Sequence, residues 1–123
     1  MSERAEIIDP GFSVADADEV VFRHDGENLM LRFRDWREKS VLIVFENTIG
    51  FGYRSGEELI HEGERYDACH LIHDSHWLRR MQEQGEAWEG PTWNHYKLNF
   101  NEGGVLEVLC TGIGSIEECT TDR

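Results

Sequence analysis

The segment from Val20 to Phe51 constrains the fold more than any other part of the chain. Apolar and polar residues alternate along it, and a period of two is typical of β-strands that bury one face. Short polar groups interrupt the alternation, which predicts four strands joined by tight reversals. A slip of one residue in the pairing would turn every apolar side chain of a strand outward, so the pattern determines the register.

Two of the reversals define the expected strand partners. Asp25-Gly26 suits a two-residue type I′ turn, because both residues of that turn need positive φ. The second reversal is Trp36-Arg37-Glu38. Together they bury the odd-numbered side chains from Leu29 to Phe51 on one face. The predicted pairs are His24 with Glu27, Phe22 with Leu29, Val20 with Leu31, Phe33 with Val41, Leu31 with Ile43 and Leu29 with Phe45.

The opposite face of the same segment mixes apolar residues with arginines. Glu19 is expected opposite Arg32, as a cross-strand ion pair. Five of the 12 Lys and Arg residues lie between Arg23 and Lys39, so they form a basic strip on an acidic chain. A solvated face balanced by the acidic N-terminal arm is favoured over a ligand site. The residues of this face are Val21, Met30, Leu42, Val44, Arg23, Arg32 and Arg34.

The second half of the chain predicts one helix between β-like segments. Residues 66–73 are compatible with a strand, and Asp74 or Ser75 then caps a helix that ends at Gly85. The apolar stripe of this helix is Trp77, Leu78 and Met81. Ser55-Gly56-Glu57-Glu58 fits a capping box, which predicts a second short helix.

The last hairpin needs an odd loop to bring its apolar residues onto one face. Asn101-Glu102-Gly103 supplies that loop, as a type I turn followed by a glycine in the left-handed region. The predicted pairs are Leu98 with Leu106, Tyr96 with Val108 and Lys97 with Glu107.

These elements predict a single domain over residues 1–123 with a mainly β (α+β) fold. An antiparallel meander forms a sandwich or a partly open barrel of six or seven strands, with one or two short helices. Residues 1–17 are expected to form a short edge strand over Ala5 to Ile8 or a mobile arm. Residues 112–123 are expected to form a short edge or a loose tail. An exposed last strand leaves a homodimer as an open alternative.

Composition and charge limit the classes of function. The longest purely apolar run, Val41 to Phe45, is far shorter than the roughly 20 residues of a membrane-spanning helix. The charged N-terminus lacks the apolar region of a signal peptide, and the three cysteines have no C-x-x-C spacing, so we expect a cytoplasmic protein. The net charge of −13 disfavours nucleic acid and anionic membranes and favours a basic protein partner.

One local cluster contains residues that bind metals. Thiolate and neutral imidazole are good zinc ligands, and Cys69, His70, His73 and His76 lie within eight residues of one another. On a strand, however, His70 and His73 project to opposite faces. A metal-binding domain, or hydrolase, that uses Cys69, His73 and His76 with zinc is therefore the alternative interpretation. No catalytic set is identified, and a small-ligand β-barrel is a third possibility.

Three tryptophans lie at turns or strand starts. Trp36, Trp88 and Trp93 either cover the core or serve as exposed anchors of the kind found at protein interfaces. Covering the core is the favoured interpretation.

The meander, the short helix and the closing strands share a pattern with a known class of protein. The closing strands are Asn94-His95-Tyr96-Lys97-Leu98-Asn99-Phe100 and Val105-Leu106-Glu107-Val108-Leu109. The chain resembles small acidic bacterial proteins of the polymorphic-toxin immunity type and their uncharacterised relatives. The resemblance implies a protein that binds and neutralises a cognate toxin, with no catalytic residues.

We therefore expect a non-enzymatic binding module with no cofactor. Its acidic surface is expected to meet a basic protein such as a toxin. The residues expected to form that surface are Glu57, Glu58, Glu62 and Glu64.

Overall fold

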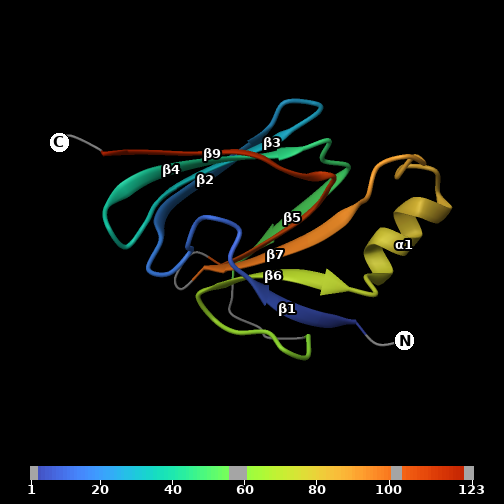
Figure 1. Ribbon diagram of the computed structural model, residues 1–123, viewed down its shortest axis with the longest axis horizontal. Coiled ribbons are helices and arrows are strands. Elements are labelled where there is room, and N and C mark those ends of the chain that lie inside the picture. Colours follow the sequence, from blue (N-terminus) through green and yellow to red (C-terminus); the bar gives the residue numbers. More distant parts are fainter. Residues whose placement is uncertain (1–2, 56–60, 101–103, 121–123) are drawn as a thin grey trace.

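The computed structural model describes residues 3–55, 61–100 and 104–120 (Figure 1). The described residues form nine strands and one helix. The strands are β1 (Arg4–Ile8), β2 (Asp18–His24), β3 (Leu29–Arg34), β4 (Lys39–Glu46), β5 (Gly50–Arg54), β6 (Ala68–His73), β7 (Asn94–Phe100), β8 (Gly104–Cys110) and β9 (Gly112–Thr120). The helix is α1 (His76–Glu83).

The strands form two antiparallel sheets that pack face to face. The larger sheet has the order β1-β6-β7-β8-β5 and the smaller one the order β2-β3-β4-β9. This arrangement confirms the expected mainly β, sandwich-like fold. The strand count exceeds the expected six or seven because both ends of the chain pair with a sheet. β1 pairs with β6, and β9 pairs with β4 as a long edge strand, where a short edge or a loose tail was expected.

The core lies between the two sheets and contains the predicted apolar face. Leu31, Ile43 and Phe45 are completely buried. Rings from the two sheets meet at the centre, with 5.8 Å between the centroids of Phe33 and Phe100. Because alternate residues of a strand point to opposite faces, this core turns the even-numbered residues of β3 and β4 outward.

The strand register expected around the turn 36–38 and in the last hairpin is confirmed. Phe33 pairs with Val41 across the turn 36–38, as expected. Leu98 pairs with Leu106 and Lys97 with Glu107, as expected, although the turn between these strands lies outside the described residues.

The predicted register of the first hairpin is wrong by two residues. His24 pairs with Leu29 rather than Glu27, and Phe22 with Leu31 rather than Leu29. The cause is the side chain of Asp25, whose Oδ1 accepts the backbone N–H groups of Glu27 and Asn28 and so extends the loop to four residues. A shift of two preserves the buried face, so the core prediction is unaffected.

The fourth strand of the predicted meander belongs to the other sheet. β5 pairs with β8 and not with β4. Asn47 has a positive φ of 51°, and the next two residues donate hydrogen bonds away from β4, Thr48 to Glu27 and Ile49 to Leu109. The chain therefore crosses between the sheets here, and Phe51 is exposed rather than buried.

A β-bulge changes the pairing of the acidic residues in β2. The register shifts between Asp18 and Val21, and Glu19 has a positive φ of 54°. The expected Glu19–Arg32 pair is therefore wrong: Val21 lies opposite Arg32, and Glu19 contacts Arg34 at 3.5 Å.

The helix begins and ends close to the predicted residues. Ser75 is the N-cap, and its side chain accepts the N–H of Leu78. Trp77 packs against the outer face of the larger sheet, where a Cβ atom on Gly50 would lie only 2.8 Å from its ring. Gly50 therefore permits the helix to approach β5. The capping box proposed at Ser55 extends into residues 56–60, which lie outside the described residues.

Candidate functional site

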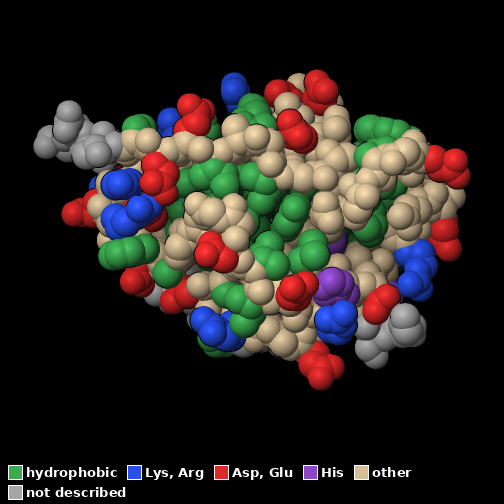
Figure 2. Space-filling view, viewed as in Figure 1, with side chains coloured by type: hydrophobic (Ala, Val, Ile, Leu, Met, Phe, Trp, Pro, Cys, Tyr) green, Lys and Arg blue, Asp and Glu red, His purple; other side chains and the backbone are tan. Residues whose placement is uncertain are grey.

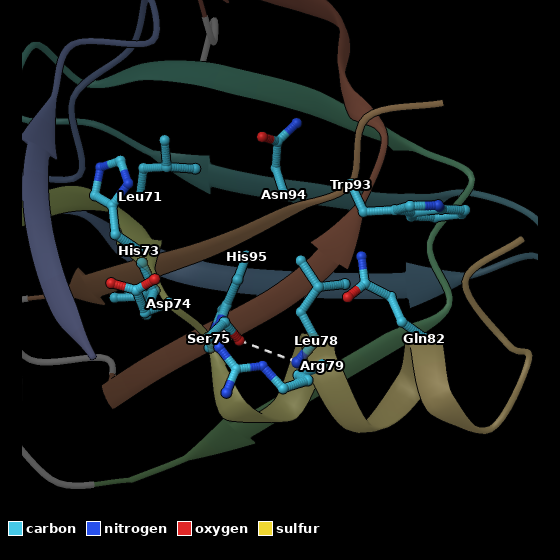
Figure 3. A pocket seen from close by; sticks show the side chains of 11 residues that line it. Leu71, His73, Asp74, Ser75, Leu78, Arg79, Gln82, Trp93, Asn94 and His95 are labelled. Atoms are coloured by element: carbon cyan, nitrogen blue, oxygen red, sulfur yellow. Dashed lines mark hydrogen bonds between the residues drawn. The ribbon is translucent and has the colours of Figure 1, made fainter. Parts of the chain in front are cut away.

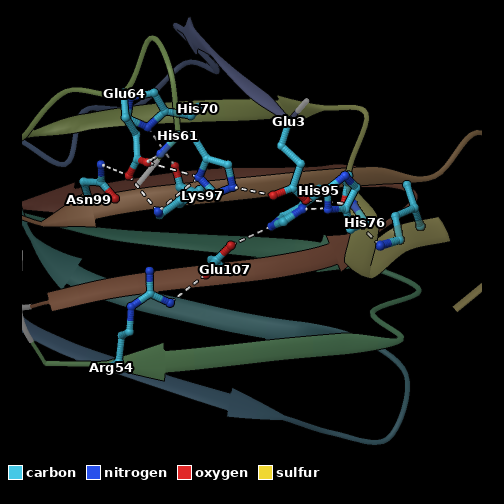
Figure 4. A network of polar contacts seen from close by, with 12 residues as sticks. Glu3, Arg54, His61, Glu64, His70, His76, His95, Lys97, Asn99 and Glu107 are labelled. Atoms are coloured by element: carbon cyan, nitrogen blue, oxygen red, sulfur yellow. Dashed lines mark hydrogen bonds and ion pairs between the residues drawn. The ribbon is translucent and has the colours of Figure 1, made fainter. Parts of the chain in front are cut away.

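Polar side chains cover the outer face of the larger sheet in two connected clusters (Figure 4). Leu98 and Phe100 of β7 point into the core, so His95, Lys97 and Asn99 point to the opposite side. All three are nevertheless buried.

The first cluster is centred on a buried ion pair. Lys97 Nζ lies 2.7 Å from Glu64 Oε1, and both side chains are fully buried. Asn99 donates to the same carboxylate at 2.9 Å, and the backbone N–H of His61 donates at 2.8 Å. Burial raises the pKa of Glu64, but the hydrogen bonds from Lys97, Asn99 and His61 outweigh it and lower the pKa to about 2.

Two histidines extend this cluster. The ring nitrogens of His61 contact Glu64 at 3.1 Å and Glu3 at 3.0 Å. His70 Nε2 accepts the backbone N–H of Arg65, so its Nδ1 carries the proton and donates to the carbonyl oxygen of Lys97. His70 is therefore neutral, and its burial lowers its pKa.

The second cluster links the helix to the sheet. Ser75 Oγ lies 2.7 Å from His95 Nδ1, and His95 Nε2 lies 2.8 Å from Glu107 Oε1. Arg54 donates to the other oxygen of Glu107 at 2.8 Å. Burial raises the pKa of Glu107, but its bonds to His95 and Arg54 lower the pKa to about 2. The ionised Glu107 accepts the Nε2 proton, which leaves Nδ1 to accept the Ser75 hydroxyl.

Serine, histidine and carboxylate stand here in the order of a nucleophile, its base and the orienting acid. Ser75 is buried, however, and its Oγ already accepts the N–H of Leu78 as the helix cap. We therefore assign Ser75, His95 and Glu107 a structural role, which is to hold the first turn of α1 on the sheet.

Ser75→Ala is expected to reduce the free energy of unfolding by about 2 kcal/mol, because it removes both the helix cap and a partner of the buried His95. Chemical denaturation measures this loss. Ser13→Ala is the matched control, since Ser13 accepts an exposed local hydrogen bond and its loss is expected to cost no more than about 0.5 kcal/mol. An equal effect of the two substitutions would contradict the structural role of Ser75.

Two surface hollows flank the second cluster. One, of about 390 Å³, lies between the two polar clusters and is lined by Glu3, His61, His76, Trp77, Arg80, His95 and Glu107. The other, of about 270 Å³, lies between the end of β6, the start of β7 and α1 (Figure 3). Ser75 and His95 line the second hollow.

The residues proposed for zinc are not gathered into one site. Cys69 packs in the core, and burial, with a smaller contribution from Asp9, raises the pKa of its thiol to about 12. His73 contacts Glu6 at 2.7 Å, and His76 lies exposed in the first turn of α1. Within residues 3–55, 61–100 and 104–120, no group of three or more His, Cys, Asp or Glu residues is arranged to hold a metal ion.

The four glutamates expected on the acidic surface have different environments. Glu62 is exposed, as expected. Glu64 is instead buried against Lys97, so it cannot reach a partner, and this part of the prediction needs correction. Glu57 and Glu58 lie outside the described residues.

Two of the three tryptophans are exposed, against the favoured interpretation. Trp36 is 60% exposed and Trp88 51%, whereas Trp93 is buried. Trp88 stacks edge-on against Trp93 with 4.7 Å between ring centroids, and the Trp93 indole N–H donates to the Trp88 carbonyl oxygen. Glu86 and Glu89, on either side of Trp88 in the sequence, are exposed, as is Glu83 at the end of α1. We call residues 84–89, which follow α1, the Trp88 loop. Its only sequence signal is the placement of Glu86 and Glu89 on either side of Trp88.

Comparisons with known proteins gave no match to a family model, a curated protein or a solved structure. The described part of the chain also contains no helix with the length and apolar character needed to cross a membrane.

Proposed function

We propose that this chain is a protein-binding module of the immunity or inhibitor type, which receives a basic protein partner on an acidic surface. The observation that carries the proposal is the Trp88 loop, where an exposed indole that packs against Trp93 lies between the exposed residues Glu86 and Glu89 in the sequence. In this proposal the protein acts in the cytoplasm, where its cysteines stay reduced.

The distribution of charge supports a basic partner. The chain has 25 acidic residues and 12 Lys and Arg residues. Several of these cations are neutralised within the fold: Lys97 pairs with Glu64, Arg54 with Glu107, Arg34 with Asp18 and Arg37 with Asp35. The excess of carboxylates therefore dominates the field outside the molecule, which accelerates encounters with a cationic protein.

The Trp88 loop has the composition of an interface anchor. Tryptophan is among the residues that contribute most to protein interfaces, because it buries a large apolar area at a low entropic cost. The contacts with Trp93 restrict the position of Trp88 before any partner arrives. Hydrophobic and acidic side chains lie near one another at the end of the molecule that carries α1 (Figure 2). A partner with an apolar pocket rimmed by Lys or Arg fits this surface.

Affinity capture at low salt is expected to recover a basic protein with the native chain and to lose it with Trp88→Ala or with Glu86→Lys/Glu89→Lys. Trp88→Ala removes the anchor, and the charge reversals repel a basic partner. Mass spectrometry identifies the captured proteins.

The matched control is Glu27→Lys/Glu117→Lys, which changes the net charge equally on two exposed residues, one in the turn between β2 and β3 and one in β9. This control is expected to keep the partner. Recovery of no basic protein, or equal loss with the control and the loop variants, would contradict the proposal.

A further inference from the structure

The outer face of the smaller sheet carries an open apolar groove bordered by arginines. It has a volume of about 390 Å³. Its lining residues are Val21, Phe22, Arg23, Met30, Arg32 and Leu42. Val21 is 53% exposed although it lies in the middle of β2. The only helix among the described residues packs on the other sheet, so it leaves this face uncovered (Figure 1).

The bulge in β2 determines the charge of this groove. It directs Asp18 and Glu19 toward Arg34, at 3.1 and 3.5 Å, and places Val21 opposite Arg32. Among the described residues, neither Arg32 nor Arg23 forms an ion pair within 4 Å. Two arginines without such partners are therefore left beside apolar side chains, on a chain that has twice as many acids as bases.

We propose that this groove docks a segment of a partner protein that carries carboxylates beside apolar side chains. The planar guanidinium group binds a carboxylate through two parallel hydrogen bonds, so Arg23 and Arg32 supply charge and direction. Val21, Met30 and Leu42 supply an apolar area that the segment would remove from water.

The positive charge of the groove favours an acidic partner segment over a second copy of the chain or a basic partner. A second copy docked symmetrically on the same face would bring the arginines of both copies together, which is repulsive. The basic partner of the Trp88 loop is repelled here for the same reason. The groove is therefore a second surface, independent of the proposed function and selective for the opposite charge.

The test uses a short extended peptide in which Leu and Glu alternate along one face and Thr occupies the other. An otherwise identical peptide has Gln in place of Glu. We expect the Glu peptide to shift the amide NMR signals of β2, β3 and β4 in the full chain. We also expect it to bind at least about tenfold more tightly than the Gln peptide.

Arg23→Gln/Arg32→Gln is expected to weaken binding of the Glu peptide by at least about tenfold, whereas Arg79→Gln, an exposed arginine on α1, leaves it unchanged. Val21→Ser tests the apolar part and is expected to weaken both peptides. Because these side chains are exposed or lie at the surface of the groove, the variants should keep the native spectrum.

Several results would overturn the proposal. They are the absence of saturable binding, equal affinity for the Glu and Gln peptides, equal loss with Arg79→Gln, or shifts confined to the larger sheet. Sedimentation that shows a dimer of the native chain, abolished by Val21→Ser but not by Arg79→Gln, would instead assign the groove to a second copy.

Discussion

Lys97→Met is expected to reduce the free energy of unfolding by about 3–5 kcal/mol, because it leaves the carboxylate of Glu64 buried without its cation. Both side chains are fully buried, so water cannot replace the lost partner. Equilibrium denaturation with urea measures the loss, with a coincident fluorescence and circular dichroism transition as the test of two-state behaviour.

Two further variants test whether the loss of stability comes from the unpaired buried charge. Lys97→Met/Glu64→Gln removes both charges and is expected to restore part of the lost stability, because a neutral amide oxygen still accepts the hydrogen bonds from Asn99 and His61. Arg34→Met removes the cation of the exposed pair with Asp18 and is expected to cost less than about 1 kcal/mol. If Lys97→Met reduced the free energy of unfolding no more than Arg34→Met, the buried ion pair would not be a major source of stability.

Acid is expected to destabilise the fold between pH 4.5 and about pH 2, by about 3 kcal/mol for each of Glu64 and Glu107. The pKa values of Glu64 and Glu107 are both lowered from 4.5 to about 2. A lowered pKa in the folded state means that the unfolded chain binds protons first. The stabilisation is therefore complete above pH 4.5 and is lost as the pH falls through the folded pKa. Urea denaturation at a series of pH values measures this slope.

Glu107→Gln separates the two contributions. The variant is expected to be less stable than the native chain at neutral pH, because it removes the charge that pairs with His95 and Arg54. The difference should shrink as the pH approaches 2, where the native Glu107 also becomes neutral. A difference that is constant over this pH range would show that Glu107 does not titrate as the structure indicates.

The sequence predicts the fold where local pattern and turn chemistry act together. The turn 36–38 has the correct length and the register around it is correct, because Phe33, Val41 and their neighbours alternate without interruption. The predicted register of the first hairpin is wrong because the Asp25 side chain accepts hydrogen bonds from two backbone N–H groups. The alternation of apolar and polar residues gives no information about these hydrogen bonds. The predicted sheet of β5 is wrong because β5 pairs with β8, which lies more than 50 residues later in the chain.

The polar clusters are predictable only in part. The sequence correctly places Lys97 opposite Glu107 on the outward side of the last hairpin. It cannot show that Glu64, from the connection between β5 and β6, buries Lys97. Ser75, His95 and Glu107 come from three separate elements and meet only when α1 packs on the sheet. The exposure of Trp88 likewise depends on Trp93, which occupies the buried position beside it.

The association rate of the captured basic partner, measured as a function of salt, tests the proposed function most directly. Acidic steering predicts that the rate constant falls by at least about tenfold from low to high salt, while the dissociation rate changes much less. Glu86→Lys/Glu89→Lys should flatten this dependence, whereas Glu27→Lys/Glu117→Lys should affect it less. A rate constant that is independent of salt for the native chain would contradict the acidic surface as the binding surface.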